Sequence, residues 1–190
     1  MKIALISSSV REDRLSHRAA LLLSDRFGAL GHALSIIDLK ELEFPPLDFV
    51  LDRHPNPNPD YIKARAEIRE ADALIFISPE YNGSYTAALK NLVDHLGKPD
   101  FAKKVIGISS PTSGPMGGMR GALAMQELVL AIWAYPIPQM LLIPEIQKKI
   151  GAQGELIDPN FERTVNNFVA EFLWTAEAIV DKKMAELARN

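Results

Sequence analysis

Apolar residues along the chain follow two alternating patterns, short continuous runs and longer stretches with helical spacing. The continuous runs predict strands at residues 2–8, 33–39, 73–78, 104–109 and 137–143. Recurrence at every third or fourth position predicts helices over residues 15–30, 61–70, 84–96, 118–133 and 160–187. The run 73–78 is typical of a strand buried on both faces of a parallel sheet. Because each right-handed crossover returns over the sheet, this alternation predicts an α/β fold, with helices on both faces of a parallel sheet.

Two segments stand apart from this alternation. Residues 44–60 contain many prolines and no core pattern, so we expect a long loop there. The last helix is long and amphipathic, and its apolar side is expected to cover one face of the sheet. The residues available for that role are Phe161, Val165, Phe168, Phe172 and Ile179.

Size and composition indicate one globular domain. The 190 residues, 47% of them hydrophobic, are enough for one core and short for two, so a single domain over residues 1–190 is expected. The formal charge of -3 includes no run of Lys and Arg, and nucleic acid is therefore not an expected partner. The absence of cysteine excludes disulfides, thiolate metal sites and cysteine nucleophiles, and it is compatible with a reducing cytoplasm.

Neither export nor membrane insertion is expected. The apolar run 3–6 ends at Ser7 and is too short for the core of a signal peptide. The most apolar later stretch, 128–143, is broken by Pro136 and Pro138 and is shorter than the roughly 20 apolar residues of a membrane helix. We therefore expect a soluble, cytoplasmic protein without a membrane partner.

Three loops that follow predicted strands are rich in hydroxyls, glycine or arginine. They are residues 7–16, the segment that begins at Pro79, and residues 109–118. In an open parallel sheet, ligands bind beyond the carboxyl ends of the strands. These loops are therefore the candidate binding site.

The first loop has the composition of a phosphate site. It offers the hydroxyls of Ser9 and Ser16 and the guanidinium groups of Arg11 and Arg14 just before a helix, whose free amides and dipole favour an anion. The alternative is that Ser16 only caps the helix and both arginines are solvated. The loop lacks the Gly-Lys-Ser/Thr ending of a triphosphate cradle and the spaced glycines of a dinucleotide fingerprint, which favours a phosphate monoester.

The second loop has the composition of a turn that holds a flat ligand. Pro79 fixes the turn, Tyr81 and Asn82 are available for contact, and Gly83 lets the backbone approach a ring closely. Ser84 is placed either to cap the next helix or to touch the ligand. The carboxylate of Glu80 is expected to pair locally while its backbone faces the cofactor, so no proton chemistry is assigned to it.

The third loop either closes over the ring from the other side or is an ordinary glycine-rich connector. No metal site is expected from the sequence. The four histidines, His17, His32, His54 and His95, lack the spacing of metal ligands and are interpreted as surface or packing residues.

With these residues in view, the chain resembles the NADPH-dependent FMN reductase family, a flavodoxin-like group of flavin, quinone, azo-dye and chromate reductases. The strongest segment is Pro-Glu-Tyr-Asn-Gly-Ser at residues 79–84, followed by Leu-Lys-Asn at 89–91 and by Asp94. Ser-Ser-Val-Arg at 8–11 is similar to the family's Gly-Ser-x-Arg phosphate loop, and Gly-Gly-Met-Arg at 117–120 to its Gly-Gly-x-Arg segment. The sequence departs from the pattern at Ser8, Ser16, Pro115 and His95.

The resemblance implies a flavodoxin-like three-layer sandwich with a five-stranded parallel sheet in the order 2-1-3-4-5. It implies that FMN is bound through its phosphate by Ser9, Arg11, Arg14 and Ser16. It also implies that the ring lies against Pro79, Glu80, Tyr81, Asn82 and Gly83 and is flanked by Ser113 and Gly114. The family commonly forms dimers or tetramers that complete the flavin site, so a homodimer or homotetramer is expected.

The resemblance further implies a hydride transfer from NADPH or NADH through FMN to a flavin, quinone, azo or similar small acceptor, in a ping-pong cycle. The flavin carries the chemistry, so no catalytic side chain is required. Two alternatives are a flavodoxin-like electron carrier and a flavin-binding regulator without turnover. The sequence leaves open the acceptor, the choice between NADPH and NADH, and whether Ser84, His17, His95 and Arg120 touch cofactor or substrate.

Overall fold

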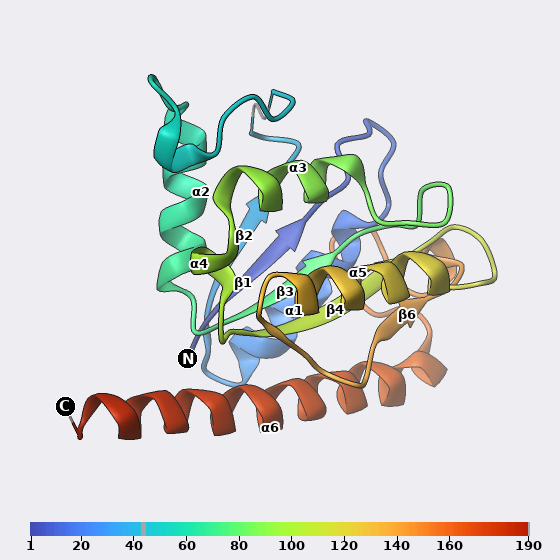
Figure 1. Ribbon diagram of the computed structural model, residues 1–190. Helices are drawn as coiled ribbons and strands as arrows, with labels where there is room; N and C mark the ends of the chain where they lie inside the picture. The colour runs from blue at the N-terminus through green and yellow to red at the C-terminus, as the bar shows by residue number, and fades with distance from the viewer. Residues whose placement is uncertain (43–44, 190) are drawn as a thin grey trace.

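The computed structural model describes residues 1–42 and 45–189 and places a parallel sheet at the centre (Figure 1). Its strands are β1 (Lys2–Ser7), β2 (Ala33–Asp38), β3 (Ala73–Ile77), β4 (Val105–Pro111), β5 (Tyr135–Pro136) and β6 (Leu141–Ile143). The order is β2-β1-β3-β4-β5, with β6 also paired to β4, and every pairing is parallel. The expected sheet and strand order are thus confirmed. Phe44, where the expected long loop begins, and Asn190, the last residue of the expected domain, lie outside the described residues.

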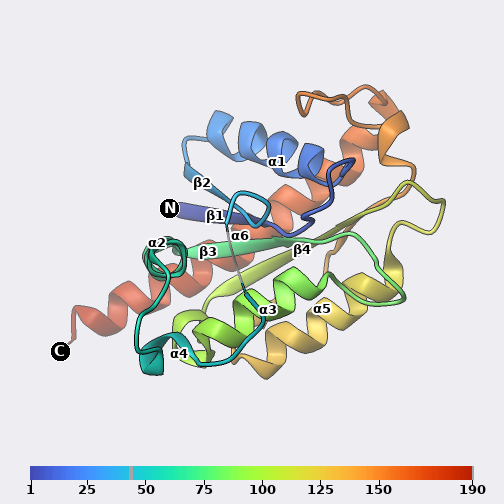
Figure 2. The same ribbon diagram turned by 90° about the horizontal axis from the view of Figure 1, so that it is seen from above.

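Helices cover both faces of the sheet, as Figure 2 shows. One face carries α1 (His17–Ala29) and α6 (Glu162–Leu187), and the other carries α2 (Pro59–Glu70), α3 (Ala87–Leu96), α4 (Lys98–Phe101) and α5 (Met119–Ala131). Single turns of 3-10 helix occur at η1 (Leu51–Arg53), η2 (Ile146–Lys148) and η3 (Pro159–Phe161). The three-layer architecture expected from the sequence is therefore present.

Two buried cores follow from the alternation of side chains along the strands. In β3, Ala73, Ile75 and Ile77 face the core under α1 and α6, whereas Leu74 and Phe76 face the opposite core. All five are fully buried, which is why the strand reads as an unbroken apolar run.

Gly107 in β4 allows α6 to pack directly against the sheet. A Cβ atom at this position would lie 2.9 Å from the ring of Phe172 and 3.0 Å from that of Phe168. Both phenylalanines come from the apolar side of the last helix, which covers this face as predicted. Because this strand position has no side chain, the helix can pack closely against the sheet.

Several boundaries differ from the sequence-based expectations by one or two residues, and two differ by more. Of the strand expected over residues 137–143 only β6 at 141–143 forms, and the short strand β5 precedes the expected range; Pro138, which lacks the N–H that a continuous ladder needs, lies between them. The helix expected from Ser84 begins at Ala87, and its N-cap is Thr86, whose Oγ1 accepts the amide of Leu89 at 3.2 Å. Ser84 is therefore not the cap. In the described part of the chain, no helix combines the length and apolar character needed to cross a membrane.

Candidate functional site

The three loops singled out from the sequence meet beyond the carboxyl ends of β1, β3 and β4. They enclose a cavity of about 360 Å³, which we call the first cavity. Its lining comprises Ser9, Arg11, Asp13, Arg14, Leu15 and Ser16 from the first loop, Pro79, Glu80 and Tyr81 from the second, Pro111, Thr112 and Ser113 at the end of β4, and Ile146 from η2. This is the position where open parallel sheets bind their ligands.

A second cavity of about 370 Å³ adjoins the first and shares Glu80 and Thr112 with it. The rest of its lining comes from the third loop and the start of α5: Gly114, Pro115, Met116, Gly118, Met119 and Arg120. The predicted residue Ser113 thus lines the first cavity and Gly114 the second. One polar and one largely apolar compartment lie side by side.

Hydrogen bonds tie the first and second loops together. Ser9 Oγ and the hydroxyl of Tyr81 share a hydrogen bond of 2.8 Å. Deeper in the site, Thr86 Oγ1 lies 2.8 Å from Ser8 Oγ, and the amide of Ser8 donates to the carbonyl of Ile77 at 3.0 Å. The two loops therefore form one rigid wall of the first cavity.

Ser16 occupies the N-cap position of α1, yet its side chain makes no capping bond. Its Oγ is buried and, among the described residues, has no hydrogen-bond partner. A buried hydroxyl without a partner costs about 1–3 kcal/mol, so its presence calls for a reason. Since Ser16 lines the first cavity at the start of a helix, an anionic ligand that accepts this hydroxyl and nearby amides fits the position.

The two arginines of the first loop are held in different ways. Arg11 is exposed, its Nε lies 3.4 Å from Asp13, and its guanidinium lies 5.7 Å from the centre of the Tyr81 ring. Arg14 is nearly buried and binds the carboxylate of Asp38 through both terminal nitrogens. Asp38, at the end of β2, is a partner that the sequence analysis did not identify.

The second loop is a tight turn. Tyr81 and Ser84 exchange two backbone hydrogen bonds of 2.8 and 3.1 Å, and the residues between them, Asn82 and Gly83, have φ values of 53° and 84°. Turns with two positive φ angles favour Asn-Gly, which is the sequence found here. Within the described residues, Asn82 and Gly83 shape this turn but do not line either cavity.

Glu80 pairs locally, as expected, and joins the second loop to α5. Its carboxylate accepts the backbone amides of Arg120 at 3.1 Å and Gly121 at 3.4 Å and the Nε of Arg120 at 2.9 Å. Burial alone would raise the pKa of Glu80, but the hydrogen bonds from Arg120 and Gly121 outweigh it and lower the pKa. Glu80 is thus an ionised cap for a helix whose own N-cap, Gly118, has no side chain.

The third loop is fixed by backbone bonds to the segment after β6. The amide of Thr112 donates to the carbonyl of Ile143 at 2.9 Å, and the amide of Ile146 donates to the carbonyl of Thr112 at 3.0 Å. These bonds bring Ile146 into the lining of the first cavity. The sequence analysis missed Ile146, although its place just after a predicted strand is the signal that would have found it.

Two further residues considered in the sequence analysis, His95 and His17, contact other parts of the protein. His95 is buried, with Nε2 lying 3.0 Å from the carbonyl of Pro45 and Nδ1 lying 3.2 Å from that of Phe49, so it packs the long loop against α3. His17 contacts Ser7 and Asp38 behind the first loop. In the described ranges, no group of three or more His, Asp or Glu side chains is arranged to hold a metal.

Comparison with known proteins agrees with this geometry. The profile of the NADPH-dependent FMN reductase family matches residues 1–148. The chain is 29% identical over 163 residues to an NAD(P)H-dependent FMN reductase from Pseudomonas aeruginosa, covering 83% of this chain and 85% of the relative. It is 30% identical over 167 residues to an NADPH:quinone oxidoreductase from Arabidopsis thaliana, covering 83% of each.

A solved structure supports the fold. The structure of a flavoenzyme NAD(P)H:(acceptor) oxidoreductase from Paracoccus denitrificans superimposes with a TM-score of 0.72 over 95% of both chains, at 20% identity. At this level of identity the likeness concerns the fold alone.

Proposed function

We propose, because the chain belongs to the NADPH-dependent FMN reductase family, that the two adjoining cavities hold FMN and that the chain passes hydride from NADPH or NADH to a small acceptor. The family assignment makes the chain an oxidoreductase with FMN and NAD(P)H as cofactors. We propose the location of the FMN site, the order in which nucleotide and acceptor react, and the class of acceptor.

The observation that carries the proposal is the buried hydroxyl of Ser16 in the first cavity, which has no hydrogen-bond partner in the described part of the chain. This hydroxyl, Ser9 Oγ and the amides at the start of α1 would hold the FMN phosphate, at a helix end where the dipole favours negative charge. The exposed guanidinium of Arg11 adds a positive charge. Hydrogen bonds to a charged group contribute about 1.5–3 kcal/mol each, so a few of them are enough to anchor the phosphate.

The ring would lie toward the second cavity, between the second and third loops. Pro79, Glu80 and Tyr81 would hold one side of it, backed by the turn at Asn82 and Gly83, and Ser113 and Gly114 would hold the other side. Met116 and Met119 provide the apolar surface that a flat aromatic ring requires. The pair between Glu80 and Arg120 holds both sides at a fixed separation.

When bound, FMN accepts hydride from NADPH or NADH and transfers electrons to an oxidised acceptor. The protein would bind and orient the ring, and backbone amides of the turn between Tyr81 and Ser84 would stabilise negative charge on it. Donor and acceptor occupy the same open face in turn, which is a ping-pong sequence. Quinones and azo compounds are the proposed acceptor classes, because relatives are named quinone reductase in Pseudomonas putida and NADPH azoreductase in a Bacillus species.

We further propose that the chain is a single domain, acts in the cytoplasm and forms a homodimer or homotetramer. Exposed apolar side chains in the long loop, including Leu47, Phe49 and Val50, support assembly, since a loop of this kind needs a surface to rest on.

The test is anaerobic rapid mixing of the FMN-loaded chain with NADPH or NADH, followed by mixing with a soluble quinone or an azo dye. Loss of the flavin absorbance with at least one nucleotide, and its recovery with an acceptor, is the expected result. Parallel lines in a two-substrate steady-state plot are expected for ping-pong kinetics. An FMN-loaded chain that neither nucleotide bleaches would overturn the proposed function.

A further inference from the structure

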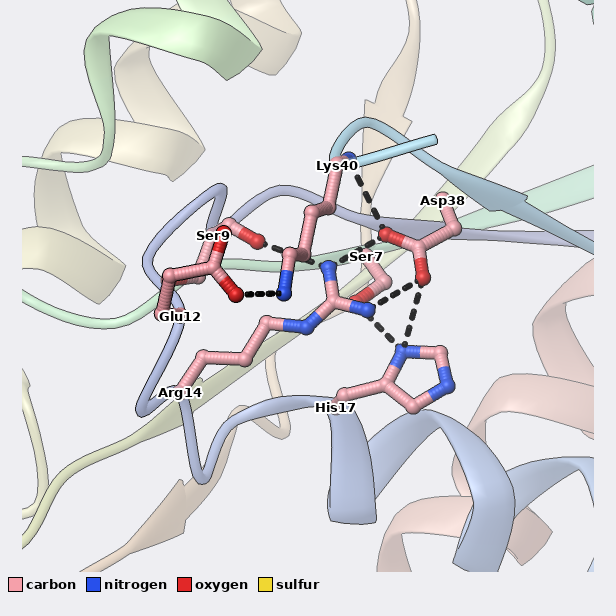
Figure 3. Close-up of polar contacts among 7 residues, drawn as sticks. All are labelled: Ser7, Ser9, Glu12, Arg14, His17, Asp38 and Lys40. Carbon is pink, nitrogen blue, oxygen red and sulfur yellow. Dashed lines mark hydrogen bonds and ion pairs between the residues drawn. The ribbon is translucent and has the colours of Figure 1, made fainter. Parts of the chain in front are cut away.

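An ion pair behind the first loop distinguishes the two arginines of that loop. Figure 3 shows the guanidinium of Arg14 directed at the carboxylate of Asp38, with His17 and Lys40 on either side of that carboxylate. The side chains of Arg14 and Asp38 are 11% and 14% exposed, whereas that of Arg11 is 60% exposed. The partly buried pair joins the first loop to the end of β2, 24 residues away in the sequence.

The hydrogens of Arg14 are largely committed to the protein. Nη1 donates both to Asp38 and to the carbonyl of Ser9, the latter at 2.8 Å, and Nη2 donates to the second carboxylate oxygen. A forked pair of this kind has a defined geometry. Arg14 therefore fixes the backbone at Ser9, which lines the first cavity.

The other groups around Asp38 leave the pair close to neutral. The backbone amide of Lys40 donates to the carboxylate at 3.1 Å, while its ammonium group pairs with Glu12 at 2.8 Å. His17 Nδ1 lies 3.5 Å from Asp38 and 3.0 Å from Ser7 Oγ. Burial lowers the pKa of His17 despite the opposing effect of Asp38, so the ring is uncharged at neutral pH.

Arg11 is held much more loosely. Its contact with Asp13 joins two exposed side chains, and such pairs contribute little because water screens them. Arg11 lines the first cavity and keeps a positive charge that, within residues 1–42 and 45–189, only the exposed Asp13 faces at 3.4 Å.

We propose that Asp38 is a positioning residue, which makes Arg14 a neutral brace for the first loop and leaves Arg11 as the arginine whose charge selects the phosphorylated flavin. This inference rests on the proposed function, because the selected group is the FMN phosphate. It predicts that removing the Arg14 and Asp38 charges together lowers the selectivity for FMN over riboflavin less than removing either charge alone. A buried ion pair replaced by apolar residues of similar volume often retains the fold, whereas a single replacement leaves an uncompensated charge.

The test compares the dissociation constants of FMN and riboflavin, which differ in the phosphate, as the riboflavin constant divided by the FMN constant. The double variant Arg14→Met with Asp38→Leu is expected to keep the ratio of the two constants within about threefold of the wild type. Arg14→Met alone leaves the Asp38 charge without its partner behind the first loop, so its ratio is expected to fall by about tenfold and to be rescued by Asp38→Leu. Arg11→Met is expected to lower the ratio by about tenfold with riboflavin binding unchanged.

Two controls separate a specific change in phosphate selectivity from a general loss of positive charge and from a failure to fold. Arg53→Met removes an exposed arginine of η1 that is not among the lining residues of either cavity, and it is expected to leave the ratio unchanged. If the Met and Leu pair fails to fold, Arg14→Gln with Asp38→Asn, which keeps both sites polar, is judged by the same ratio.

A double variant that loses phosphate selectivity by tenfold or more, while riboflavin still binds, would make Arg14 a direct phosphate ligand and overturn the inference. Unchanged selectivity in Arg11→Met would overturn it as well. Absence of FMN binding in the wild-type chain would instead overturn the proposed function, before any variant is compared.

Discussion

The two ends of the candidate FMN site are held by different kinds of interaction. At the phosphate end, charged side chains fix the first loop, with the pair of Arg14 and Asp38 at its centre. At the ring end, backbone conformation dominates, and Asn82, Gly83 and Gly118 have φ values of 53°, 84° and 69°. Changes of charge are therefore expected to act on phosphate recognition. Addition of a Cβ atom is expected to act on the shape of the site and on folding.

The largest expected effect is at the ring end, in the variant Gly118→Ala. A Cβ atom here would lie 2.1 Å from Ser110 Oγ, and the residue has a φ of 69°. Left-handed backbone strain and displacement of the buried serine, which donates to the carbonyl of Ser78 at 3.0 Å, are expected to lower the free energy of unfolding by about 2–4 kcal/mol. Urea denaturation measures this change.

Gly28→Ala is the matched control for that experiment. Gly28 lies within α1, and a Cβ atom there would meet no heavy atom within 4 Å. Because alanine is the better helix former, this variant is expected to gain about 0.5–1 kcal/mol. Equal destabilisation by both substitutions would mean that Gly118 has no special role at the ring end.

The next largest effect is expected at the phosphate end, in the variant Ser16→Ala. The variant removes a hydroxyl that has no partner among the described residues of the ligand-free chain, so the free energy of unfolding is expected to stay constant or rise by up to about 1 kcal/mol. The affinity for FMN is expected to fall by about 1.5–3 kcal/mol, because a hydrogen bond to the phosphate is lost. Denaturation and flavin fluorescence titration measure the two quantities.

Ser109→Ala provides the comparison for Ser16→Ala. Ser109 Oγ is also buried without a partner in the described chain, but it lies in β4 and lines neither cavity. This variant is expected to bind FMN as the wild type does. If both variants lost FMN affinity equally, the effect would be a general one of the sheet edge and not specific to Ser16.

The smallest of the three effects is expected for Glu80→Gln, which weakens the link between the second loop and α5. Loss of the charged cap is expected to cost about 1 kcal/mol at pH 7. The pKa of Glu80 is lowered below its usual 4.5, so its contribution is present above that pH and is lost as the pH falls through the folded value. The difference between wild type and variant should therefore shrink below about pH 4.5 in denaturation curves.

Asp94→Asn is the control for the loss of a carboxylate. Asp94 pairs with Lys90 one helical turn away, with both side chains well exposed. The expected change in the free energy of unfolding is less than about 0.5 kcal/mol. A change as large as that of Glu80→Gln would show that a surface pair matters as much as the link to α5.

Local patterns were sufficient to predict most of the fold. The unbroken run at β3, the helical spacing in α1 and α6, and the positions of the three loops all correspond to the structure. The division of the fifth strand was not predicted, because β6 depends on pairing with β4, which no local pattern encodes. Thr86 was missed as a cap because the tight turn before it moves the helix start from Ser84.

The site was predicted in part. Ser9, Arg11, Arg14, Ser16 and Tyr81 share one cavity, since each loop follows its strand directly. The ion pair of Arg14 with Asp38 was not visible in the sequence, because Asp38 belongs to another strand and only the β1 to β2 pairing brings the two together. Ion pairs between residues on different strands cannot be predicted from the spacing of residue types along the sequence.

The most direct test of FMN binding at this cavity is a parallel calorimetric titration of the purified chain with FMN and with riboflavin. One FMN per chain is expected, with an affinity at least about tenfold higher than that for riboflavin, because the phosphate gains hydrogen bonds at the start of α1. Absence of FMN binding, or equal affinity for the two flavins, would contradict a phosphate site formed by the first loop.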